Sequence, residues 1–169
     1  MVNSIQQTCQ MLNETERKFL ERAIELAREG MNKGRGGPFG CVIVINGEVV
    51  GEGYNMVAST NDPTAHAEIV AIRQACKKLN SFQLSGCDVY TSCEPCPMCL
   101  GAIYWARAER VIYANTRDDA AAIDFDDKFI YKEINTDMQM REIPFIHEPH
   151  PLALQVFNDW RKMEDRTKY

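Results

Sequence analysis

The sequence has few of the features that mark membrane, secreted and nucleic-acid-binding proteins. No apolar run approaches the ~18 residues of a membrane-spanning helix. Met1 to Met11 has neither the basic region nor the apolar core of a signal peptide. Positive charge is not in surplus, because 19 Lys and Arg residues stand against 24 Asp and Glu residues. We therefore expect a cytoplasmic protein without membrane association, and the acidic balance disfavours nucleic acid as a partner.

The cysteines do not form the pattern of a disulfide-stabilised secreted protein. The chain has 7 of them, an odd number, and Cys93, Cys96 and Cys99 lie close together. Reduced thiols in a cytosolic protein fit this distribution better than a disulfide framework does. A chain of 169 residues, 45% of them hydrophobic, can form one domain with a substantial core.

The hydrophobic pattern predicts helices that alternate with strands. Asn13 and Glu16 form a capping-box pattern, and Asn46-Gly47 is typical of a type I′ hairpin turn. Helices are expected over about 14–32, 64–79, 95–106 and 152–166, and strands over 41–45, 48–53, 88–91, 110–114 and 143–146. This alternation predicts an α/β layered sandwich over residues 13–169, preceded by a loose tail at 1–12.

Two short motifs carry the chemistry. His66-Ala67-Glu68 supplies an imidazole and a carboxylate, and Pro95-Cys96-Pro97-Met98-Cys99 supplies two thiolates. His66, Cys96 and Cys99 are the metal ligands we expect, because three soft ligands hold zinc and leave the fourth tetrahedral position open for water. Glu68 is the expected catalytic residue, since a carboxylate beside that water can move its protons.

Other interpretations of these residues were weighed. Cys93 as a fourth ligand would close the site and make a structural zinc module, in which Glu68 would have no role. We favour three ligands, because Cys93 precedes the helix and its thiol need not share the face of Cys96 and Cys99. The run Gly34 to Gly40 could suggest a phosphate-binding loop, but a strand follows it, so we interpret it as a turn.

The chain resembles the cytidine deaminase superfamily and, within it, the bacterial guanine deaminases. His-Ala-Glu with Pro-Cys-x-x-Cys marks only the superfamily. The longer strings that narrow the resemblance are GGPFGCVIV (36–44), NDPTAHAEIVAIRQAC (61–76), YTSCEPCPMCLGAIYWA (90–106) and FDDKFIYKEI (125–134), with a final Tyr169. Asp124 departs from the pattern, which has a small residue before Phe-Asp-Asp.

The resemblance implies a three-layer α/β/α sandwich around a mixed five-stranded sheet, and one Zn2+ per chain. It also implies a homodimer in which residues 143–169 are exchanged between subunits. Its ligand and proton-shuttle positions match those chosen above from the residues. The substrate-binding positions that it implies are Asn55, Asp127, Phe39, Trp105 and Tyr169.

The function predicted from this resemblance is the hydrolysis of guanine, a purine base, to xanthine and ammonia. Zinc-bound hydroxide would attack the amine-bearing carbon, and Glu68 would shuttle the protons. Guanosine deamination and tRNA adenosine deamination stay open as alternatives, because their motifs overlap with these. The acidic balance and the Phe-Asp-Asp segment count against the tRNA branch.

Overall fold

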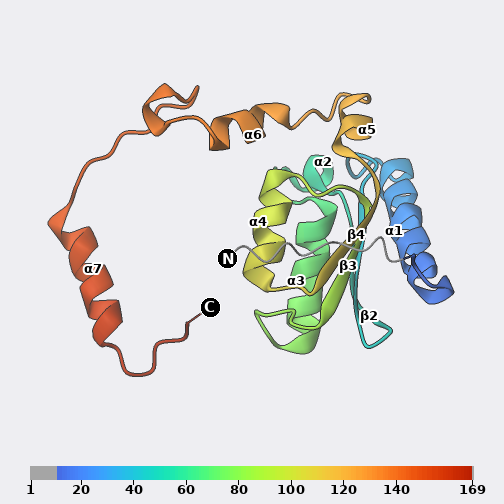
Figure 1. Ribbon diagram of the computed structural model, residues 1–169, viewed down its shortest axis with the longest axis horizontal. Coiled ribbons are helices and arrows are strands. Elements are labelled where there is room, and N and C mark those ends of the chain that lie inside the picture. The colour runs from blue at the N-terminus through green and yellow to red at the C-terminus, as the bar shows by residue number, and fades with distance from the viewer. Residues whose placement is uncertain (1–10, 169) are drawn as a thin grey trace, which may run out of the picture. The chain divides into compact units, whose positions relative to one another are not determined.

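The computed structural model describes residues 11–168. The chain divides into two compact units, Met1–Asp126 and Asp127–Tyr169. The first unit holds the sheet and the predicted zinc ligands (Figure 1). Among the described residues, no helix is both long enough and apolar enough to cross a membrane.

The described residues of the first unit form a four-stranded mixed sheet with the strand order β2-β1-β3-β4. Its strands are β1 (Gly40–Ile45), β2 (Glu48–Tyr54), β3 (Cys87–Cys93) and β4 (Arg110–Asn115). Strand β1 pairs antiparallel with β2 and β3, while β3 and β4 run parallel. The hairpin between β1 and β2 has positive φ at Asn46 and Gly47, which agrees with the predicted turn.

Helices cover both faces of this sheet, so the first unit has three layers (Figure 1). The helices are α1 (Glu14–Asn32), α2 (Val57–Thr60), α3 (Ala67–Leu79), α4 (Pro97–Ala106) and α5 (Arg117–Ala121). Val42 of β1 packs in a cluster with Ala23 and Leu26 of α1. Ile43, on the opposite face, packs in a cluster with Ala71 of α3. Strand β1 is therefore buried on both sides, as its unbroken apolar run predicts.

Helix α3 lies directly on strand β2 because Gly53 has no side chain. A Cβ at Gly53 would overlap the backbone carbonyl of Ala67 and lie 2.9 Å from Cβ of Val70. The first turn of α3, which carries His66 and Glu68, is thus held beside the end of β2, where Asn55 follows.

Two sequence predictions were wrong in this unit. The helix expected from about residue 64 begins at Ala67, because Asp62 and Thr64 form a turn first. Asp62 Oδ1 accepts hydrogen bonds from the Thr64 backbone N–H at 2.8 Å and from its hydroxyl at 2.6 Å. Such local side-chain bonds compete with helix formation. The capping box of Asn13 and Glu16 and the helix after it are confirmed.

The five-stranded sheet was also expected, and the described residues contain four strands. Residues 143–146, predicted as an edge strand, have no regular secondary structure. A strand forms only when it pairs with another strand, and Pro144 removes one backbone donor from this segment.

The second unit has no core of its own among its described residues. It contains α6 (Lys128–Ile134), a 3₁₀ turn η1 (Met138–Met140) and α7 (Pro151–Lys162). None of its described residues is buried. On α7, Leu152, Val156 and Trp160 follow one another at helical spacing, and their exposed fractions are 63%, 63% and 44%. An apolar helix face of this kind requires a partner surface.

Candidate metal centre and active site

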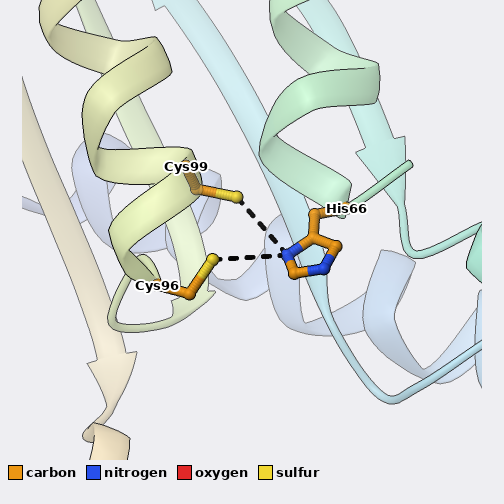
Figure 2. A group of neighbouring side chains, drawn as sticks. All are labelled: His66, Cys96 and Cys99. Atoms are coloured by element: carbon orange, nitrogen blue, oxygen red, sulfur yellow. Dashed lines mark hydrogen bonds between the residues drawn. The ribbon is translucent and has the colours of Figure 1, made fainter. Parts of the chain in front are cut away.

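His66, Cys96 and Cys99 converge on one point, although His66 precedes α3 and the two cysteines lie at the start of α4 (Figure 2). The Nδ1 atom of His66 lies 3.4 Å from Sγ of Cys96 and 3.5 Å from Sγ of Cys99. All three potential ligand atoms lie within 4.8 Å of one another. Within residues 11–168, this is the group of His, Cys, Asp and Glu side chains that could hold a metal ion.

The distances fit a zinc ion. Tetrahedral zinc with Zn–S bonds of about 2.3 Å and Zn–N bonds of about 2.05 Å separates its nitrogen and sulfur ligands by about 3.6 Å. The two measured nitrogen–sulfur distances, 3.4 and 3.5 Å, are close to this value. One imidazole and two thiolates also form a donor set that favours zinc over magnesium or calcium.

The local sequence explains why these side chains meet. His66 is the N-cap residue of α3 and Cys96 is the N-cap residue of α4, where Pro97 begins the helix. Cys99 follows in the first turn of α4, so its sulfur lies on the same side as that of Cys96. Both helix N-termini carry partial positive charge, which favours thiolate.

The hydrogen bonds of the site separate the two thiols in acidity. Bonds from Cys99 and His66 lower the pKa of the Cys96 thiol to about 4, against the opposing effect of burial. The hydrogen bond between the two thiols has the opposite effect on Cys99, whose pKa it raises together with burial. The bond to Cys96 also raises the pKa of His66. The first proton therefore leaves this pair of thiols easily, and a bound metal ion favours loss of the second.

Glu68 lies next to this cluster in the first turn of α3 and is only 7% exposed. Burial raises the pKa of its carboxyl group, an effect that hydrogen bonding partly offsets. A carboxyl group whose pKa lies closer to neutrality can both take up and release protons, which suits it to general acid–base catalysis.

Asn55 and Phe39 lie side by side at one end of the sheet. Asn55 directly follows β2, is 5% exposed, and donates its backbone N–H to the Phe39 carbonyl at 3.0 Å. The next residue, Met56, donates its N–H to the Ala65 carbonyl at 2.9 Å. This second bond ties the segment after β2 to the residue that precedes the ligand His66.

Among the described residues, the structure does not bring the other predicted substrate residues together with Asn55 and Phe39. Trp105 lies on α4 and is 69% exposed. Asp127 is the N-cap residue of α6 and belongs to the second unit. Tyr169 lies outside the described residues. The substrate roles of all three stay predictions.

Phe125 makes a contact that the sequence does not reveal. Its ring meets that of Phe39 edge to face, with a centroid distance of 5.0 Å. In the sequence, Phe125 is recognisable only as the first residue of Phe-Asp-Asp. No periodic pattern connects it to Phe39, which lies far away in the chain. Its partner at residue 39 is visible only in three dimensions.

Cys93 is bonded away from the cluster, which agrees with the three-ligand interpretation. Its Sγ donates to the Thr116 carbonyl at 3.5 Å, and the side chain is 6% exposed. Burial raises the pKa of this thiol to about 11, so it stays protonated at neutral pH. The fold and the remaining Cys₂His ligand set define a zinc-binding α/β/α domain with one zinc ion per chain.

Comparison with known proteins identifies the family. Residues 13–115 match the family described as the cytidine and deoxycytidylate deaminase zinc-binding region. The chain belongs to this family of zinc-dependent deaminases.

Two relatives and one solved structure define the similarity further. Guanine deaminase of Bacillus subtilis is 55% identical over 151 residues, which cover 89% of this chain and 97% of that protein. The X-ray structure of guanine deaminase from Bacillus subtilis superposes with a TM-score of 0.89 at 53% identity, covering 94% of this chain and 99% of that one. A tRNA-specific adenosine deaminase of Aquifex aeolicus is 43% identical over 96 residues, or 57% of this chain and 63% of that protein.

Proposed function

We propose that the protein is a zinc-dependent guanine deaminase that converts guanine and water to xanthine and ammonia. Two observations together support the proposal. The chain places a Cys₂His cluster beside a buried glutamate, and it is 55% identical to a guanine deaminase over 97% of that protein's length. The similarity to the tRNA-specific enzyme of Aquifex covers less of both chains. A closed structural zinc site is not favoured, because Cys93 is bonded to Thr116.

Each residue near the cluster has a chemical task in this proposal. When bound, zinc would supply an activated water molecule at its open position, because three protein ligands lower the pKa of such a water to about 7. Glu68 accepts a proton from that water and delivers it to the ring nitrogen beside the amine-bearing carbon. It then takes the remaining proton from the oxygen that has added to the carbon and passes it to the amine, which leaves as ammonia while that oxygen becomes the carbonyl of xanthine.

We assign the binding of the base to the substrate residues predicted from the sequence, of which Asn55 and Phe39 lie together at one end of the sheet. The Oδ1 atom of Asn55 accepts the Val57 backbone N–H at 3.2 Å, which directs the amide NH₂ away from that segment. In the proposal this NH₂ donates to guanine, Phe39 packs against the base, and Asp127 accepts hydrogen bonds from it. Trp105 and Tyr169 would exclude water from the pocket, which strengthens these polar contacts.

We further propose a homodimer in which residues 143–169 cross to the partner subunit. The support is that the second unit has no buried residue among those described, although α7 carries an apolar face. The first unit also exposes apolar side chains, with Leu100 and Tyr104 on α4 and Tyr113 on β4 exposed by 38%, 77% and 47%. Mutual burial of such surfaces is a usual driving force for dimer formation.

The reaction is expected in the cytoplasm. Six cysteines are free among the described residues, which suits a reducing compartment.

The substrate is tested with a panel. Ammonia release is measured for the zinc-loaded protein with guanine, guanosine, adenine and an adenosine-containing tRNA. We expect guanine to react at least ~100-fold faster than the others in kcat/KM, since hydrogen-bonding sites reject analogues strongly. Faster turnover of guanosine or of the tRNA would replace the proposed substrate.

The crossing of the C-terminus is tested by truncation after Thr167, with sedimentation measured in parallel. The truncated chain should stay dimeric and keep its melting temperature, while kcat/KM for guanine falls by at least ~10-fold. A monomeric full-length protein, or unchanged turnover after truncation, would contradict the proposal.

A further inference from the structure

The glycine-rich loop between α1 and β1 touches two of the proposed substrate residues. The sequence analysis interpreted this loop as a simple turn. Its members Gly36 and Gly37 each lie against a side chain of the proposed pocket, and neither has room for a Cβ atom. The absence of side chains at these two positions therefore allows the neighbouring pocket residues to lie where they do.

Gly36 faces the amide of Asn55. A Cβ at Gly36 would overlap Oδ1 of Asn55 and would lie 2.9 Å from its backbone oxygen and 3.0 Å from its Cγ. Asn55 cannot yield easily, because its Oδ1 accepts the Val57 N–H at 3.2 Å and its own N–H binds the Phe39 carbonyl. Moving the amide would break the bond that sets its orientation.

Gly37 faces the two aromatic rings. A Cβ there would lie 2.8 Å from Cζ of Phe125, 3.1 Å from its Cε1 and 3.0 Å from Cε2 of Phe39. The two rings already meet edge to face at an interplanar angle of 87°. A methyl group at this point would push the rings from their contact, and Phe39 would move with respect to the bound base.

Backbone hydrogen bonds fix the loop before and after the glycine pair. A new Cβ atom would therefore displace the pocket side chains rather than the loop. The Arg35 N–H donates to the Gly30 carbonyl at 3.0 Å, and the Arg35 carbonyl accepts the Ser59 N–H at 3.0 Å. The Phe39 N–H donates to the Gly37 carbonyl at 2.9 Å. These bonds anchor the residues that flank the glycine pair.

We propose that Gly36 and Gly37 are specificity-determining positioning residues, which set the amide of Asn55 and the ring of Phe39 against the base. The inference rests on the proposed function, since it assumes that Asn55 and Phe39 contact the purine. Displacement of a positioning group by about 1 Å can cost up to ~100-fold in rate.

The test compares Gly36→Ala and Gly37→Ala with Gly34→Ala, a control in the same loop with no atom within 4 Å of the new Cβ. Steady-state kcat and KM for guanine, zinc content and melting temperature are measured for each. The dissociation constant of guanine is also measured by calorimetry with each variant in a Glu68→Gln background, where binding is separated from turnover. We expect at least ~10-fold weaker guanine binding and higher KM in the two pocket variants, with one zinc per chain retained. Gly34 has φ at 61°, so the control should lose some thermal stability, while its guanine binding and KM stay within about twofold of the parent.

A second variant tests the ring contact separately. Adding Phe125→Leu to Gly37→Ala removes part of the ring that the new Cβ would strike, so guanine binding should recover at least ~3-fold relative to Gly37→Ala alone.

Unchanged binding in both folded alanine variants would overturn the inference. Loss of zinc and of thermal stability in both would also overturn it, because the glycines would then serve the fold rather than the pocket. Failure of the proposed function is distinct: the parent protein would not turn over guanine in the same assay.

Discussion

Cys99→Ser should remove most of the zinc, whereas the same change at Cys93 should leave it bound. Cys99 is fully buried, and its Sγ lies 3.5 Å from Nδ1 of His66, within the ligand cluster. The Cys93 sulfur instead donates to the Thr116 carbonyl. The two sites are alike in chemistry and burial, so the pair isolates the effect of metal ligation.

The size of the effect follows from the number of ligands. Zinc binding to four-ligand protein sites is worth about 10–16 kcal/mol, so one ligand accounts for roughly 3 kcal/mol if the ligands contribute equally. Cys99→Ser should therefore weaken zinc binding by at least ~100-fold. At Cys93 a serine hydroxyl can still donate to Thr116, so we expect a stability change of about 1 kcal/mol and no change in zinc affinity.

Zinc affinity would be measured by competition with a chromogenic chelator, with circular dichroism as the control for folding. Equal loss of affinity in both variants would refute the three-ligand site and would favour a closed Cys₃His centre. Retained affinity in a folded Cys99→Ser protein would refute the assignment of Cys99 itself.

Three further predictions concern the same structure. Zinc affinity should rise by at least about tenfold per pH unit between pH 6 and 8, because Cys99, whose pKa is raised, must release its proton to the metal, and His66, whose pKa is also raised, must be neutral to bind; an affinity independent of pH would contradict this. Gly53→Ala should lower the free energy of unfolding by about 1–3 kcal/mol in urea titrations, because the new Cβ overlaps the Ala67 carbonyl, and unchanged stability would show that α3 does not lie so close to β2. Arg107→Gly should raise that free energy by about 0.5–1 kcal/mol, because Arg107 ends α4 with φ at 57°, where glycine is favoured; a loss of stability would show that the arginine side chain matters more than its backbone.

The sequence predicted those parts of the fold that depend on local patterns. Helix α1 has both a capping box and helical periodicity, and the hairpin turn at Asn46-Gly47 has residues that accept positive φ. The zinc ligands were predictable for the same reason, because each motif lies within a few residues of a helix start.

What the sequence did not predict depends on contacts between distant segments or on competing local bonds. The start of α3 was placed too early, because the Asp62 side chain forms a turn with Thr64 that the hydrophobic pattern does not reveal. The edge-to-face contact of Phe39 and Phe125 and the packing of Gly36 on Asn55 join residues far apart in the chain. A strand at 143–146 was expected from its apolar residues, but pairing requires a neighbouring strand, and the described residues provide none for it.

The most direct test of the account compares the parent protein with Glu68→Gln, both loaded with one zinc ion per chain. Guanine is supplied, and xanthine and ammonia are quantified together. We expect equal amounts of both products from the parent and a rate lower by at least ~100-fold from Glu68→Gln, because the substitution keeps the size of the side chain and removes its titrating group. Rapid xanthine formation by the zinc-loaded Glu68→Gln protein, or no xanthine from the parent, would contradict the central claim.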